Sequence, residues 1–113
     1  MADQFDLEDF CVSSKLVAVQ MQAETPAEVI SQLSQILVDQ GYAKSTYAQA
    51  AIEREETSPT GLPTDGVRVA IPHAGVEHTL KPGLAIGTLA KPVLFGELGD
   101  TDSKLDVSIA VSY

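Results

Sequence analysis

The stretch TPAEVISQLSQILVDQG, residues 25–41, predicts an amphipathic helix with a marked beginning and end. Thr25 and Glu28 have the spacing of a capping box, and Pro26 suits the first helical position. Gly41 stands where a left-handed residue commonly ends a helix, so we expect the helix to run to about Gln40. The apolar positions recur at intervals of three and four and form one buried face: Val29, Ile30, Leu33, Ile36 and Leu37.

The rest of the chain predicts one more helix and several strands. Residues 45–55 favour a short, alanine-rich helix, and residues 54–66 hold two prolines and two glycines, which is typical of a loop with turns. Strands are expected at residues 15–22, 67–71, 84–90, 93–95 and 105–112. The order of one strand, two helices and then several strands predicts an α+β fold, with a mixed β-sheet flanked by helices.

The last expected strand, LDVSIAVS, alternates apolar residues with polar or small ones. We expect its apolar side to pack against the helix of residues 26–40, because one face of such a strand is buried. The expected inward residues are Leu105, Val107, Ile109 and Val111.

Composition limits the classes of function. A chain of 113 residues with 44% hydrophobic side chains forms one core, which we place in residues 15–113 behind a flexible acidic N-terminus of residues 1–14. A net charge of −9 makes nucleic acid and an anionic membrane surface poor expectations and favours a basic protein surface as partner. No apolar run is long enough to cross a bilayer, so direct membrane insertion is not expected. The single Cys11, the acidic start and the lack of an apolar run of roughly 20 residues predict a cytoplasmic protein.

The stretch VAIPHAG places His73 at the end of an apolar strand. Pro72 stiffens the backbone before the ring, while Ala74 and Gly75 leave the space beside it open. Such an imidazole could be an ordinary loop residue or a nucleophile that accepts a group and passes it on. Arg54, Thr60, the glycine-bearing loop and His78 are candidates to bind a phosphoryl group there.

A metal site is the main competing interpretation, because His73, Glu77 and His78 lie within six residues. A spacing of five separates the two histidines on a helix and places them on opposite faces of a strand. The HExxH pattern is absent. We therefore expect neither a metal nor another cofactor.

The segment IEREETSPTGLPTDGVRVAIPHAGVEHTLKPGLAIGTLAKPVLFGE resembles the enzyme IIA domains of the bacterial sugar phosphotransferase system, of the fructose/mannitol class and its galactitol-type branch. The similarity rests on an ERExx(S/T)PTG segment, a strand ending in AIPH and a KP turn about ten residues later. It covers roughly residues 15–112.

The resemblance implies a phosphotransferase with a phosphohistidine intermediate. His73 would accept the phosphoryl group from the phosphocarrier protein and pass it to a cysteine of the enzyme IIB component, which serves the membrane component IIC. Arg54, Thr60 and Gly61 would lie beside His73, and His78 would either replace the second active-site histidine of mannitol-type proteins or be a surface residue.

Two further expectations follow. Family members usually continue through another pair of helices that cover the sheet, so this chain is either a fragment or a shortened domain, and we expect a monomer or a weak dimer. Besides sugar transport, a regulatory phosphoprotein of the same fold, like the nitrogen-related enzyme IIA, and a non-catalytic binding module remain open.

Overall fold

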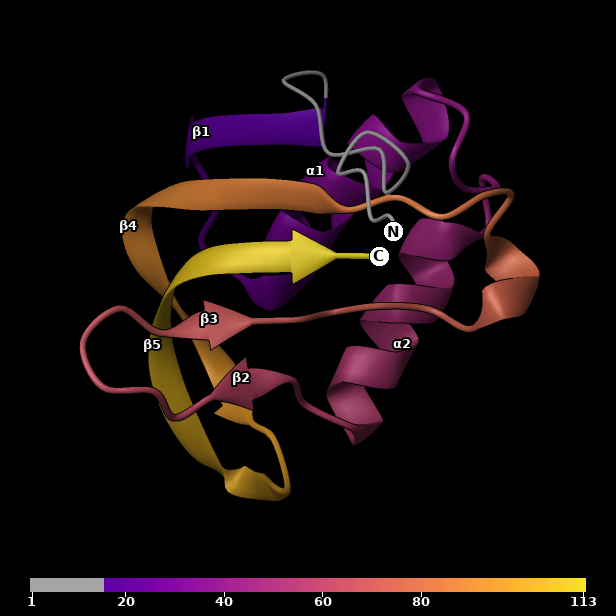
Figure 1. Cartoon of the computed structure of the whole chain (residues 1–113). Coiled ribbons are helices and arrows are strands. Elements are labelled where there is room, and N and C mark those ends of the chain that lie inside the picture. The colour runs from indigo at the N-terminus through magenta and orange to yellow at the C-terminus, as the bar shows by residue number, and fades with distance from the viewer. Residues whose placement is uncertain (1–15) are drawn as a thin grey trace, which may run out of the picture.

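The computed structural model describes residues 16–113, so the expected acidic N-terminus lies outside the described residues. In chain order the elements are β1 (Val17–Met21), α1 (Pro26–Asp39), α2 (Tyr47–Thr57), β2 (Gly61–Leu62), β3 (Val69–Ala70), the 3₁₀ turn η3 (Val76–His78), β4 (Ala85–Glu97) and β5 (Asp100–Ser112) (Figure 1). The predicted α+β class, with a mixed sheet beside helices, is confirmed.

Helix α1 begins as its sequence predicts. The Thr25 hydroxyl accepts a hydrogen bond from the Glu28 amide at 3.2 Å, and Pro26 occupies the first turn. The Glu28 carboxylate accepts from the Glu24 amide at 2.7 Å, which satisfies one more group at the helix start. At the other end, Gly41 has a φ of 83°.

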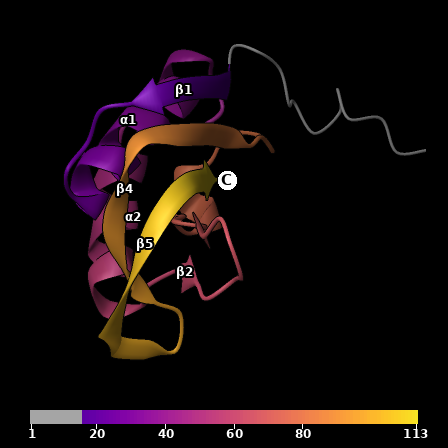
Figure 2. The same cartoon turned by 90° about the vertical axis from the view of Figure 1, so that its left-hand side faces the viewer.

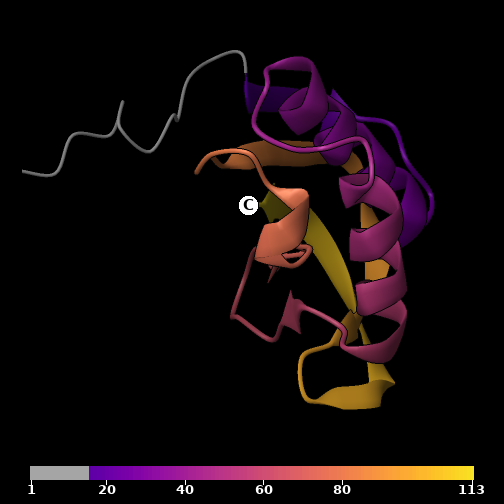
Figure 3. The ribbon, with the colours of Figure 1, turned by 90° about the vertical axis from the view of Figure 1, so that its right-hand side faces the viewer.

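The five strands form one mixed sheet in the order β1-β4-β2-β3-β5, with β4 also paired to β5. Strand β1 runs parallel to β4, and β3 runs parallel to β5, whereas β4 and β5 form a long antiparallel hairpin. Figures 2 and 3 show both helices on the same side of this sheet. The core lies between the two layers and includes Val29, Leu33, Phe95 and Val107.

Several expected strand boundaries were wrong, including the start of the last strand, which is Asp100 instead of Leu105. The two short strands predicted at 84–90 and 93–95 are one continuous strand, β4, whose pairing with β5 is irregular between Thr88 and Val93 and again between Gly96 and Glu97. Pro92 lies in the first of these irregular stretches, where its missing amide breaks no ladder bond. The predicted strand 67–71 contracts to β3, and the predicted loop 54–66 contains the two-residue strand β2.

The expected orientation of the last strand is confirmed for Leu105 and Val107 but was wrong for Ile109 and Val111. The amides of Ser108 and Ile109 both donate to the carbonyl of Arg68, at 3.0 and 3.3 Å, so two residues of β5 face one residue of the neighbouring strand. Such a bulge shifts the alternation by one residue. Val107 is therefore buried before the bulge, but Ala110 is buried after it.

The partner strand confirms which side Ala110 faces. Ala110 pairs with Gly87 of β4, and a Cβ built on Gly87 would lie 3.1 Å from the Leu33 side chain of α1. Paired residues of an antiparallel ladder share a face. Ala110 therefore faces the helices, and Ile109 and Val111 lie on the opposite side of the sheet.

Candidate active site

His73 follows strand β3 after two intervening residues. Ala70 ends the strand and pairs with Ala110 of β5, so the backbone entering the site is tied to the sheet. Pro72 is buried and fixes φ immediately before the histidine. The sequence thus holds the imidazole at the end of a rigid, partly buried segment.

Two contacts fix the His73 ring. Its Nδ1 lies 2.9 Å from the carbonyl oxygen of Ile71. Because a carbonyl oxygen only accepts hydrogen bonds, Nδ1 carries the proton and Nε2 keeps its lone pair. The ring also stacks on Tyr113, with centroids 4.8 Å apart and an interplanar angle of 17°. The imidazole is thereby held in the form in which Nε2 is the nucleophile.

The stacking residue is itself anchored from α2. The Tyr47 hydroxyl donates a hydrogen bond to the backbone oxygen of Tyr113, and Tyr47 is fully buried. Burial raises the pKa of Tyr47 to about 12, against the opposing effect of a backbone hydrogen bond from Ala74. Tyr47 therefore joins the residue after His73 to the residue that covers its ring.

His73 lines an open cavity of about 700 Å³. The cations of its wall are Arg54 from α2 and Lys81 from the loop before β4. Lys81 places its Nζ 4.6 Å from the centre of the Tyr42 ring, a cation–π contact. The remaining lining residues are mainly apolar or small: Ala74, Gly75, Val76, Thr79, Leu80, Pro82, Gly83, Leu84 and Tyr113.

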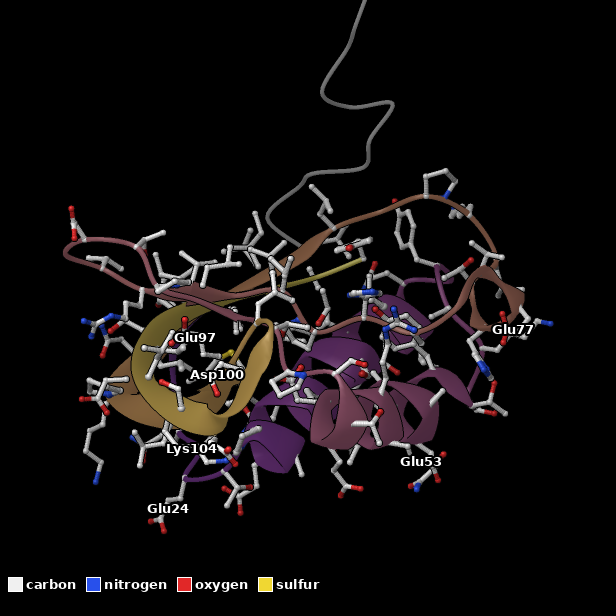
Figure 4. All side chains as sticks on the ribbon, turned by 90° about the horizontal axis from the view of Figure 1, so that it is seen from below. Glu24, Glu53, Glu77, Glu97, Asp100 and Lys104 are labelled. Carbon is white, nitrogen blue, oxygen red and sulfur yellow. The ribbon has the colours of Figure 1, made fainter. Side chains whose placement is uncertain are left out.

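The cavity combines a nucleophilic imidazole with positive charge in a strongly acidic protein. In Figure 4 the labelled carboxylates Glu24, Glu53 and Glu77 lie at the outside of the molecule, and all three are exposed. An anion near His73 would meet the Arg54 guanidinium, which can donate two parallel hydrogen bonds to a phosphoryl group. The geometry therefore suits covalent chemistry with an anionic group at Nε2.

The structure brings His73 and Arg54 together but separates the other predicted site residues from the cavity wall. The Thr60 hydroxyl is buried and donates to the Glu55 carboxylate at 2.8 Å. Gly61 lies in β2, where a Cβ would approach the carbonyl oxygen of Gly96 to 2.6 Å. Both residues hold the sheet and the loop that precede His73, and their direct contact with a phosphoryl group stays a prediction.

His78 is bound to the connection between the helices. Its Nδ1 lies 2.8 Å from the Thr46 hydroxyl, and its carbonyl accepts the Lys44 amide at 2.9 Å. The side chain of Glu77 lies 3.7 Å from its Nε2. His78 is not among the residues that line the His73 cavity, and a role for it at the phosphoryl group also stays a prediction.

Glu55 is a residue near the site that the sequence motifs do not single out. Glu55 is only 8% exposed, and burial raises the pKa of its carboxyl group, while hydrogen bonds from Thr60 and the charge of His73 act in the opposite direction. A signal was present, because Tyr47, Ala51 and Glu55 follow at intervals of four residues on the buried face of α2.

Across residues 16–113, no three His, Cys, Asp or Glu side chains gather in a way that could hold a metal ion. Neither helix of that region is long and apolar enough to cross a membrane.

Residues 11–112 match the family model described as phosphoenolpyruvate-dependent sugar phosphotransferase system, EIIA 2. The chain belongs to this family. Among EIIA 2 relatives, it is 33% identical over 104 residues to the mannitol-specific EIICBA component of Escherichia coli strain K12, covering 89% of this chain and 16% of that protein. It is also 37% identical over 81 residues to the transcriptional regulator ManR of Bacillus subtilis strain 168, covering 72% of this chain and 12% of the regulator.

Solved structures agree with the fold. The crystal structure of IIA mannitol from Escherichia coli superposes with a TM-score of 0.72 at 28% identity and covers 89% of this chain and 69% of its own. A putative PTS IIA from Streptococcus mutans gives a TM-score of 0.73 at 25% identity, covering 94% of this chain and 64% of its own. The predicted galactitol-type branch is not supported by these relatives, which are mannitol-specific proteins, an unassigned IIA and a regulator.

Proposed function

We propose that this chain is a phosphotransferase of the mannitol/fructose type that carries a phosphoryl group on Nε2 of His73. The observation that carries the proposal is the hydrogen bond from Nδ1 to the Ile71 carbonyl, which leaves the Nε2 lone pair free in a cavity that also holds Arg54. Membership of the EIIA 2 family supports the same chemistry.

The reaction is an exchange of one bond to phosphorus for another. The Nε2 lone pair attacks the phosphorus of a phosphorylated donor, the new N–P bond forms, and the bond to the donor breaks with its electron pair returning to the donor. The Nδ1 proton stays on His73 and keeps its hydrogen bond to Ile71. Arg54 is placed to stabilise the negative charge on the phosphoryl oxygens in both directions of transfer.

The proposed donor is the phosphocarrier protein, and the proposed acceptor is a cysteine thiolate of an enzyme IIB component that serves the membrane component IIC. One similar solved structure is a complex of enzyme IIA and phosphorylated enzyme IIB for mannitol from Escherichia coli, 27% identical to this chain with a TM-score of 0.72, which supports an IIB partner. A cytoplasmic location is proposed with these partners. The exact sugar is left open, because this domain does not contact it in the scheme.

Intact-mass measurement after incubation with phosphoenolpyruvate, enzyme I and the phosphocarrier protein tests the proposal. The sample must stay neutral or basic, since phosphohistidine is labile in acid. We expect one phosphoryl adduct on the wild-type chain and on His78→Ala, and none on His73→Ala. An adduct that survives in His73→Ala and disappears in His78→Ala would reverse the assignment.

A regulatory role is the second candidate, and the similarity to the regulator ManR favours considering it. In that case the phosphorylated His73 domain would change the activity of a larger protein instead of supplying sugar transport. Presenting the phosphorylated chain to an enzyme IIB component separates the two roles, because a transport component passes its phosphoryl group on. Neighbouring IIB and IIC genes would also favour transport.

A further inference from the structure

A continuous chain of hydrogen bonds links helix α2 to the His73 ring. The two carboxylate oxygens of Glu55 accept the Thr60 amide at 2.9 Å and the Thr60 hydroxyl at 2.8 Å. The Ile71 amide in turn approaches the Thr60 hydroxyl oxygen at 3.2 Å and the Thr60 carbonyl oxygen at 3.3 Å. The Ile71 carbonyl finally accepts from Nδ1 of His73 at 2.9 Å.

The arrangement of donors and acceptors has one direction. An ionised carboxylate only accepts, so the Thr60 hydroxyl must donate to Glu55 and can then accept from Ile71. Both backbone groups of Ile71 are therefore hydrogen-bonded: its amide donates to Thr60, and its carbonyl accepts from the imidazole of His73. A rotation of this residue would break bonds at both ends.

We propose that Glu55 is a positioning residue for His73, acting through Thr60 and the backbone of Ile71 to fix the Nδ1–H tautomer and the direction of Nε2. Its role in phosphoryl transfer rests on the function proposed above. Thr60 then supports His73 through the Ile71 backbone, whether or not it also makes the predicted contact with phosphate.

Burial explains why such a support is strong. Glu55 is 8% exposed and Thr60 is 3% exposed, so water cannot readily replace their hydrogen bonds. A buried carboxylate that loses one partner keeps the cost of its desolvation, which gives the paired arrangement a clear preference over alternatives. Glu56, the next residue, is exposed and offers a matched control, because it has the same charge and lies in the same turn of the helix.

Charge adds to geometry. When Nε2 gains the phosphoryl group and Nδ1 keeps its proton, the imidazole ring becomes positively charged. A positive charge on His73 lowers the pKa of Glu55, beside the larger raising effect of burial, so the two side chains interact electrostatically. A negative charge on Glu55 therefore stabilises the positive imidazole ring of the phosphorylated form.

The test compares Glu55→Gln with Glu56→Gln in the whole chain. Imidazole ¹⁵N chemical shifts report which ring nitrogen of His73 carries the proton, independently of any transfer reaction. We expect the wild type and Glu56→Gln to show the Nδ1–H tautomer and Glu55→Gln to show a mixture. We also expect Glu55→Gln to lower kcat/KM for phosphorylation about tenfold, the change that a loss of about 1.4 kcal/mol in the transition state produces.

Thr60 provides a second pair of variants in case Glu55→Gln folds poorly. Thr60→Val removes the hydroxyl while keeping the shape, and we expect the same mixed tautomer. Thr60→Ser restores the hydroxyl and should return the wild-type tautomer and rate. A structural role alone would lower the melting temperature without moving the tautomer of the folded protein.

The failure of this inference is distinguishable from failure of the proposed function. A wild-type ring with the proton on Nε2, or variants at Glu55 and Thr60 that keep the Nδ1–H tautomer and the normal rate, would overturn the positioning role. Absence of any phosphorylation of the wild-type chain would instead overturn the proposed function, whatever the tautomer.

Discussion

Arg54 and Glu55 are neighbours in the last two turns of α2, yet their side chains enter opposite environments. Arg54 is exposed and lines the His73 cavity, whereas Glu55 is buried against Thr60. Successive residues of a helix project about 100° apart, at 3.6 residues per turn, so one short segment can present a cation to the cavity and a carboxylate to the interior. In the proposed function, Arg54 would therefore bind the phosphoryl group while its neighbour Glu55 supports the nucleophile.

Arg54→Ala should slow phosphorylation by about ten- to a hundredfold, because a charge-assisted hydrogen bond contributes roughly 1.5–3 kcal/mol. The melting temperature should change little, since the side chain is exposed. Rapid-quench kinetics with the phosphorylated donor measure the rate, and calorimetry measures the melting temperature. Lys91→Ala, which removes an exposed cation outside the cavity wall, is the control. An Arg54→Ala protein that melts early but is phosphorylated normally when folded would make Arg54 a structural brace.

Tyr47 gives the stability of the fold a predictable alkaline limit. Its pKa of about 12 in the folded protein exceeds the ordinary value of 10.0, because burial disfavours the phenolate. The unfolded chain loses this proton first, so the unfolded state binds fewer protons and stability falls as pH rises from about 10 to about 12. Two pKa units correspond to about 3 kcal/mol, all of it present below pH 10.

Urea unfolding between pH 8 and pH 12 checks this expectation. Tyr47→Phe should lower the unfolding free energy at pH 8 by about 1–3 kcal/mol, because the backbone oxygen of Tyr113 loses its donor. The unfolding free energy of Tyr47→Phe should also fall less steeply with rising pH than that of the wild type. Tyr113→Phe keeps both the stacking ring and the backbone oxygen and serves as the control. Equal alkaline slopes for wild type and Tyr47→Phe would contradict the prediction.

At the scale of elements, the bulge at Ser108–Ile109 decides what each face of β5 contacts. Before it, Val107 lies in the core, and after it, Ala110 takes the inward position opposite Gly87. A small side chain is needed there, because α1 passes close to the sheet at Leu33. The bulge therefore allows β5 to place a larger side chain, Val107, in one part of the core and a small one, Ala110, where α1 lies close to the sheet.

Ala110→Val tests this orientation. We expect a loss of about 1–3 kcal/mol in the free energy of unfolding, the usual cost of overpacking a filled core. Ala90→Val makes the same change at an exposed position of β4 and should stay within about 0.5 kcal/mol of wild type. Urea denaturation measures both. An Ala110→Val protein as stable as Ala90→Val would mean that Ala110 does not face α1.

Helix α1 was predictable because its signals are local: the Thr25 cap, Pro26 and the apolar spacing all lie within the helix or beside it. The bulge in β5 was not, because it depends on a carbonyl of Arg68, forty residues away in sequence. The site divides in the same way. His73 and Arg54 were predicted from motifs, whereas the burial of Glu55 depends on how α2 packs against the rest of the fold.

At the scale of the whole molecule, the two helices of residues 16–113 cover one side of the sheet. The other side of the sheet is more apolar than the sequence suggested. The bulge turns Ile109 and Val111 toward that side, where both are half-buried. At the edge of the sheet, Val17 and Val19 are 40% and 69% exposed. Gln20 follows them with a φ of 54°, an irregularity that interrupts the edge strand and limits pairing with another chain.

We expect a monomer or a weak dimer with fixed tertiary packing. The net charge of −9 opposes close association of identical chains, and Ile109 and Val111 on the open side are half-buried, so neither stable dimers nor aggregates are favoured. Light scattering over a concentration series gives the mass, and repeating it in 1 M salt, where the screening length is about 3 Å, should increase any dimer fraction. The tyrosine signal in near-UV circular dichroism reports fixed packing around Tyr47. Large polydisperse particles, or a missing tyrosine signal, would show that the open side of the sheet requires a further covering layer.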